Sequence, residues 1–112
     1  MLDQVSSIPP QRDPVVQAFA MALRQRLGSH LQQILLFGSH ARGDAHDGSD
    51  YDMLVVVDRR TPELRAMILE VESQLMEHYG ALVATVLRSE AEWQQTQGFP
   101  LARNIAREGV PL

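Results

Sequence analysis

The chain has 112 residues, the length of one domain with a core of its own. Its net charge of −4 excludes a broad basic surface for duplex nucleic acid, and the lack of cysteine excludes disulfides and thiolate metal sites. The N-terminus lacks the basic and apolar segments of a secretory signal, and no apolar stretch is long enough to cross a bilayer. We therefore expect a cytoplasmic protein.

Apolar periodicity and punctuating residues predict alternating helices and strands. Asp13 before Pro14, and Thr61 before Pro62, are typical helix starts, while Ser89 and a glutamate three residues later form a capping box. The expected elements are an irregular tail at 1–13, a helix at 14–27, a strand at 31–37, a short helix or turn at 39–45, a strand at 50–57, a helix at 61–79, a strand at 81–87 and short helices at 89–95 and 100–108.

Three strands with helices between them predict a small layered α/β or α+β domain. The second strand is almost wholly apolar after its first residues, so we expect other elements to cover both of its faces. The long helix at 61–79 carries one apolar stripe, ending at Tyr79, and should lie across the sheet. Residues 14–112 are expected to form this single domain.

The most informative motif joins the first two strands. Gly38 and Ser39 close the first strand and, after ten residues, Asp50 and Asp52 open the second. Residues two apart in a strand project from one face, so the two carboxylates should converge. Paired carboxylates suit Mg²⁺ together with substrate phosphates, and the Gly-Ser turn offers backbone N–H groups to an anion. The motif predicts a nucleotide site.

The charged residues between the two halves of the motif allow more than one interpretation. Arg42 could reach the polyphosphate, or it could be a surface arginine neutralised by Asp44 or Asp47. His40 and His46 do not fit a standard zinc spacing, and exposed loop histidines are the commoner case.

With Gly38, Ser39, Asp50 and Asp52 in this order, the chain resembles the minimal nucleotidyltransferase domains of the DNA polymerase beta superfamily. The segment SHARGDA and the ending NIAREGVPL are also similar to stand-alone members, so the resemblance extends from about residue 14 to the end. It implies an αβαβαβ core with a mixed sheet, and ATP with Mg²⁺ as the nucleotide donor.

Such minimal domains often form toxin–antitoxin pairs with a HEPN-domain protein. The resemblance implies an antitoxin that transfers AMP to a tyrosine of the HEPN toxin and releases pyrophosphate. Asp50 and Asp52 would then bind Mg²⁺ and act as the catalytic pair, while Gly38, Ser39 and Arg42 would hold the phosphates.

The chain departs from the fuller sites of that superfamily, which carry a third carboxylate on the next strand. The segment 81–87 has no acidic residue, and Asp58, Glu90 and Glu92 lie outside the expected positions. An alternative is therefore a binding antitoxin that neutralises its partner by association alone. Because the motifs use nearly the whole chain, we expect the acceptor site to need another chain, in a hetero-oligomer or a homodimer. A third and less favoured alternative is a dimer that transfers the nucleotide to a small molecule.

Overall fold

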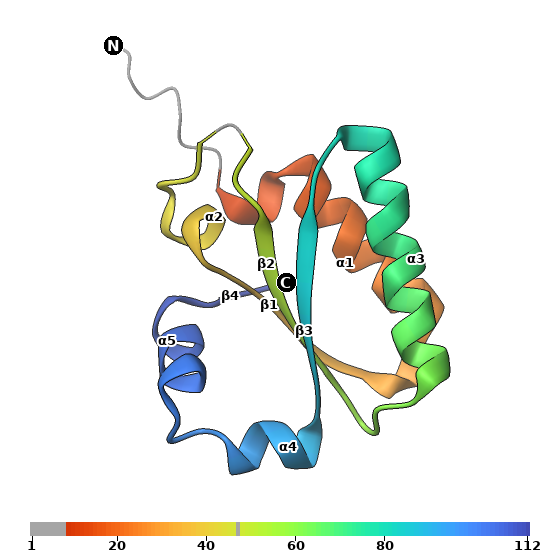
Figure 1. The fold of residues 1–112 in the computed structure, drawn as a ribbon, viewed down its shortest axis with the longest axis vertical. Helices are drawn as coiled ribbons and strands as arrows, with labels where there is room; N and C mark the ends of the chain where they lie inside the picture. The colour runs from red at the N-terminus through yellow and green to blue at the C-terminus, as the bar shows by residue number, and fades with distance from the viewer. Residues whose placement is uncertain (1–8, 47) are drawn as a thin grey trace.

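The fold is that of a computed structural model, which describes residues 9–46 and 48–112 (Figure 1). Its elements are η2 (Pro10–Arg12), α1 (Pro14–Leu27), η3 (Gly28–His30), β1 (Leu31–Phe37), α2 (Ser39–Arg42), β2 (Tyr51–Val57), α3 (Pro62–Tyr79), β3 (Val83–Ser89), α4 (Glu90–Gln95), α5 (Pro100–Glu108) and β4 (Val110–Pro111). The α/β fold expected from the sequence is confirmed. Of the expected irregular tail, residues 1–8 lie outside the described residues, and the remainder contains η2.

The strands form one mixed sheet in the order β3-β2-β1-β4. β1 runs antiparallel to β2 and to β4, whereas β2 and β3 are parallel. A parallel pair requires a crossover connection, and α3 supplies it. The mixed sheet that the resemblance implied is therefore present.

The predicted caps begin the helices. The side chain of Asp13 accepts a hydrogen bond from the N–H of Val15 at 2.9 Å, and Thr61 does the same for Leu64 at 3.1 Å. Each bond satisfies one of the backbone donors that the first turn of a helix leaves unpaired. The helix starts read from the sequence are thus set by local chemistry.

Side chains of β2 alternate between two apolar clusters on opposite faces of the sheet. Met53, Val55 and Val57 pack into the larger cluster with the buried stripes of α1 and α3. Leu54 and Val56 pack into a smaller cluster on the other face, with Ile105 of α5 and partly buried side chains of β3 and α4. Both faces of β2 are covered, as its apolar sequence predicted. The expected stripe of α3 is wrong at Tyr79, whose side chain is 46% exposed at the last residue of the helix.

Three strand assignments differ from those expected. β2 begins at Tyr51, one residue later than the predicted 50–57, so Asp50 lies just outside the strand. β3 begins and ends two residues later than the predicted 81–87, because Arg88 and Ser89 continue the pairing with the end of β2. β4 was not expected at all. It consists of two residues beside β1, and the N–H of Leu112 donates to the carbonyl of Ile34 at 3.0 Å. Among the described helices, none has the length and apolar character needed to cross a membrane.

Candidate functional site

Asp52 lies beside the end of β1, paired across the sheet with Phe37. By strand alternation it shares a face with Leu54, on the side of the sheet away from α1 and α3. Asp50 is exposed and lies just before β2. Partial burial, and then the charge of Asp50, raise the pKa of Asp52 above its ordinary value. The two carboxylates that the motif predicted are thus electrostatically coupled.

Gly38 packs directly against Asp52. Its φ of 79° lies in the left-handed region that favours glycine. A Cβ at this position would collide with the carboxylate oxygen Oδ2 of Asp52. A glycine at this position was expected to let another backbone come close, but the group that approaches Gly38 is the side-chain carboxylate of Asp52. Both halves of the motif are therefore in contact.

After Gly38 the chain turns through α2, which is shorter than the expected segment 39–45. The N–H groups of Ala41 and Arg42 both donate to the carbonyl of Gly38 at 3.1 Å, and Gly43 ends the turn. Ser39 begins this turn and is half-buried. The turn thus brings Arg42 within electrostatic reach of Asp52, and Ser39 directly follows the glycine that contacts Asp52.

Arg42 is held between two carboxylates. Its Nε donates to Asp44 at 3.2 Å, and its Nη1 donates to Glu108 at 3.1 Å. The pairing with Asp44 agrees with one of the two interpretations of the sequence, whereas Asp47 lies outside the described residues. The charge of Arg42 also lowers the pKa of Asp52, against the stronger effects that raise it. The guanidinium therefore lies within electrostatic reach of the carboxylate pair.

Glu108, at the end of α5, is the site residue that the sequence did not identify. The N–H of Gly38 donates to its Oε1 at 3.1 Å, and its side chain is 20% exposed. Its charge is among those that raise the pKa of Asp52. The antiparallel pairing of Leu36 with Val110 brings Glu108 opposite Gly38. The ending of the chain was noticed in the sequence, but a two-residue strand leaves no periodicity from which this contact could be predicted.

His40 and Tyr51 make aromatic and polar contacts next to the motif. The rings of His40 and Tyr51 stack with centroids 3.7 Å apart, and Nε2 of His40 lies 3.0 Å from the carbonyl of Ser49. The Tyr51 hydroxyl donates to Asp13 at 2.7 Å, which ties β2 to the start of α1. Burial, together with this bond, raises the pKa of Tyr51 well above its ordinary value. His40 is therefore half-buried in the loop instead of exposed as expected, and its charge lowers the pKa of Asp52 more than that of Arg42 does.

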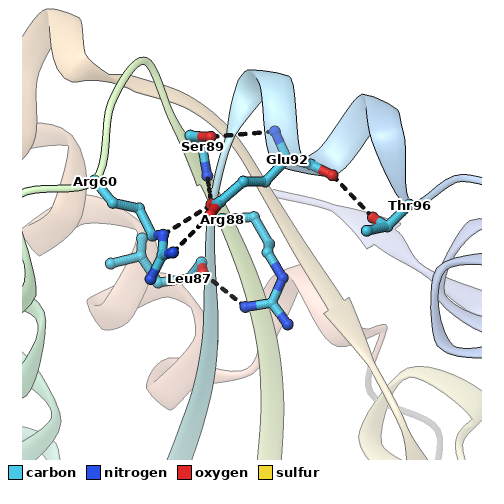
Figure 2. A network of polar contacts seen from close by, with 6 residues as sticks. All are labelled: Arg60, Leu87, Arg88, Ser89, Glu92 and Thr96. Atoms are coloured by element: carbon cyan, nitrogen blue, oxygen red, sulfur yellow. Dashed lines mark hydrogen bonds and ion pairs between the residues drawn. The ribbon is translucent and has the colours of Figure 1, made fainter.

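The acidic residues considered as a third carboxylate lie at the other end of the sheet. The partner of Asp52 on β3 is the exposed Ala84, so the neighbouring strand carries no acid there. Glu92 instead accepts from the N–H of Ser89 at 2.8 Å and from Arg60 in a bidentate ion pair at 2.6 and 2.7 Å (Figure 2). In the same region, Asp58 pairs with His30 at 3.0 Å. Among the described residues, no group of three histidine or acidic side chains could hold a metal ion.

Comparison with known proteins shows to which family the chain belongs. The family model of the nucleotidyltransferase domain matches residues 16–111. A protein of Methanocaldococcus jannaschii, provisionally named a protein adenylyltransferase, is 28% identical over 100 residues, which cover 89% of this chain and 96% of its own.

Two solved structures share the fold. One, described as a toxin–antitoxin with AMP-PNP, has a TM-score of 0.62 and 24% identity, covering 85% of this chain and 69% of the other. A mutant of the toxin–antitoxin MntA-HpeT has a TM-score of 0.60 and 21% identity over the same shares. Because the family model spans nearly the whole chain, from the start of α1 to β4, the protein belongs to the nucleotidyltransferase domain family and is a nucleotidyltransferase.

Proposed function

We propose that this protein transfers AMP from ATP to a hydroxyl group of a partner protein, the tyrosine of a HEPN-domain toxin, and so acts as its antitoxin. The observation that carries the proposal is the packing of the Gly38 turn against Asp52, with Asp50 beside it. The name of the Methanocaldococcus relative supports protein adenylylation. The structural neighbours, one with an ATP analogue, support ATP as the donor and a toxin as the partner.

Asp50 and Asp52 suit Mg²⁺ by the chemistry of their donor atoms. Their charges act on each other, so a cation between them would relieve the repulsion that helps to raise the pKa of Asp52. Two carboxylates leave coordination positions for phosphate oxygens and water, which is the usual arrangement around Mg²⁺. When bound, the ion would supply positive charge to the triphosphate.

The remaining residues of the motif would bind and orient the donor. Ser39, with the guanidinium of Arg42, would hold the β- and γ-phosphates, while Gly38, whose N–H donates to Glu108, would shape the turn. The acceptor oxygen then forms a bond to the α-phosphorus while the bond from that phosphorus to the bridging oxygen breaks. Pyrophosphate leaves, and the hydroxyl proton passes to water. Catalysis of this kind is mostly positioning and charge stabilisation, which the short turn supplies.

The space for the acceptor supports a protein substrate. Ala84 is exposed beside Asp52 and contributes only a methyl group, so a side chain from another molecule has room above β3. A small molecule would normally be enclosed by a deep cleft. A tyrosine carried by a folded partner would not need one, because the partner itself covers the site.

The test is transfer of label from α-labelled ATP, in Mg²⁺, to a HEPN protein encoded beside this chain. We expect label on the partner with the wild type and none with Asp50→Asn or Asp52→Asn. Asp58→Asn is the matched control, because Asp58 lies beyond the opposite end of β2. If the two proteins form a complex and the partner still takes up no label, the proposal is wrong.

The second candidate function is neutralisation of the partner by binding alone. Ala84, where a third carboxylate would lie beside Asp52, favours it. It predicts that the double variant Asp50→Asn, Asp52→Asn still protects cells from the partner. Loss of protection in a double variant that folds and still binds would exclude this function and leave the enzymatic one.

A further inference from the structure

We propose that Glu108 is a positioning residue of the nucleotide site: its carboxylate fixes the Gly38 turn and the guanidinium of Arg42 in the geometry that receives the phosphates. The inference rests on the proposed function, since it gives Glu108 a role in that same site. Glu108 is distant in sequence from every residue of the motif.

One oxygen atom makes both contacts. Oε1 of Glu108 accepts from the N–H of Gly38 and from Nη1 of Arg42, each at 3.1 Å. The first contact fixes the backbone that lies on Asp52, and the second sets the direction of a long cationic side chain. Hydrogen bonds to a charged acceptor are the stronger kind. Glu108 therefore joins the backbone of the turn to the guanidinium of Arg42 through a single carboxylate oxygen.

The carboxylate is carried by a rigid support. Ile105, one turn earlier in α5, is fully buried in the second cluster. Two residues after Glu108, Val110 pairs with Leu36 of β1, two residues before Gly38. Helix packing on one side and strand pairing on the other thus fix the position of Glu108 relative to the turn. A rigid scaffold of this kind is what precise positioning requires.

Glu108 is the less exposed of the two carboxylate partners of Arg42. The side chain of Arg42 is 47% exposed, and its other partner, Asp44, lies on the same exposed loop. Without Glu108 the guanidinium would keep only its contact with Asp44. The expected consequence is weaker binding of the triphosphate, with a smaller effect on the chemical step.

The variants Glu108→Ala and Glu108→Gln separate positioning from proton transfer. Alanine removes both bonds, and we expect the KM for ATP to rise about tenfold or more, the effect of losing hydrogen bonds to a charged group, with a smaller change in kcat. Glutamine keeps an acceptor oxygen at the same place, and its KM should stay within about threefold of the wild type. Glu77→Ala, on the exposed side of α3, is the control.

Two results would overturn the role of Glu108. If Glu108→Gln loses kcat as completely as Glu108→Ala while KM is unchanged, the carboxylate acts as a proton acceptor. If Glu108→Ala has wild-type KM and kcat, the contacts have no functional consequence. Should the alanine variant not fold, Glu108→Asp takes its place: it keeps the charge but its shorter side chain falls short of Gly38, so the same rise in KM is expected.

Amide hydrogen exchange of residues 38–42, measured without nucleotide, separates this inference from the proposed function. We expect faster exchange in Glu108→Ala and near wild-type exchange in Glu108→Gln. Unchanged exchange in the alanine variant would overturn the positioning role whatever the nucleotide data show. If the wild type binds no AMP-PNP with Mg²⁺ while exchange responds as expected, the failure belongs to the proposed function.

Discussion

At Gly38 the absence of a side chain determines where another side chain can lie. The Asp52 carboxylate occupies the space that a Cβ would need, so residue 38 and residue 52 are coupled by contact across the sheet. This contact explains why the motif has a glycine at position 38. The same glycine also adopts a positive φ, which adds a second constraint.

The variant Gly38→Ala should abolish transfer activity and nucleotide binding, because the new methyl group displaces Asp52. The matched control is Gly80→Ala at the end of α3, where φ is also positive but nothing lies within 4 Å of a Cβ. Gly80→Ala should lose about 1–2 kcal/mol of stability from backbone strain, and Gly38→Ala, whose ψ of −159° lies in a region nearly reserved for glycine, about 1–3 kcal/mol. Thermal unfolding and AMP-PNP binding by calorimetry check this. Equal binding by both variants would contradict the coupling of Gly38 with Asp52.

The raised pKa of Asp52 predicts a pH-dependent stability. A carboxyl group whose pKa is raised in the folded state destabilises the fold as it ionises, so stability falls as the pH rises through the interval between its ordinary and its raised pKa. Asp52→Asn removes this penalty, and its Tm should exceed that of the wild type at neutral pH. The difference should vanish in acid. Added Mg²⁺ should raise the Tm of the wild type but not of the variant, and the opposite order of Tm at neutral pH would contradict the assignment.

At the scale of the element, α4 is anchored by one glutamate. Glu92 takes part in two interactions (Figure 2). It forms the capping box with Ser89, and it makes a bidentate ion pair with Arg60 from the loop before α3. These bonds, the Arg60 bond foremost, lower the pKa of Glu92 to about 2. The network connects β3, α4 and the start of α3 at the end of the sheet away from Asp52.

We predict that Glu92→Gln destabilises the fold without loss of AMP transfer per folded molecule. Because the pKa is lowered from 4.5 to about 2 on folding, the stabilisation is complete above pH 4.5 and disappears as the pH falls toward 2. The Tm difference between wild type and variant should therefore be largest at neutral pH and should disappear in acid. Glu90→Gln, on the same short helix, is the control. A loss of transfer activity equal to that of Asp52→Asn would show that Glu92 belongs to the site after all.

The elements that could be predicted are those with strong local signals. Helix starts follow from Asp13, Thr61 and Ser89, whose side chains cap the backbone in the way their positions indicated. The apolar runs on both sides of the Gly-Ser and Asp-x-Asp motif predicted the two strands, β1 and β2, between which the structure places the motif. The expected burial of Tyr79 was wrong: this residue ends α3 and is exposed.

What could not be predicted depends on contacts between distant segments. The sequence gives no period for β4, because two residues are too few, and one of them is a proline suited to an edge strand. Glu108 is brought beside Gly38 by that strand and by the packing of α5, so its role was missed although the ending NIAREGVPL that contains it was noticed. Tertiary pairing, and not local preference, completes the candidate site.

For the molecule as a whole, the C-terminal segment closes the site at the edge of the sheet. Val110 and Leu112 pack against the main core while β4 pairs with β1. In Figure 1 the chain passes from β3 through α4 and α5 and returns to β1, so the last residues lie beside the strand that carries the Gly-Ser turn. The fold thus makes residues 108–112 a structural part of the candidate site.

Removal of residues 110–112 should therefore weaken nucleotide binding more than it weakens the fold. The loss of two half-buried apolar side chains should cost about 1–3 kcal/mol, which leaves the core under α1 and α3 folded. Glu108 would then lack the strand that holds it beside Gly38, and the affinity for AMP-PNP with Mg²⁺ should fall about tenfold or more. Removal of Leu112 alone keeps the pairing of Val110 and Pro111 with β1 and should have a much smaller effect on affinity. Calorimetry on both shortened chains decides the matter: equal affinities would mean that β4 stabilises the sheet but does not position the site.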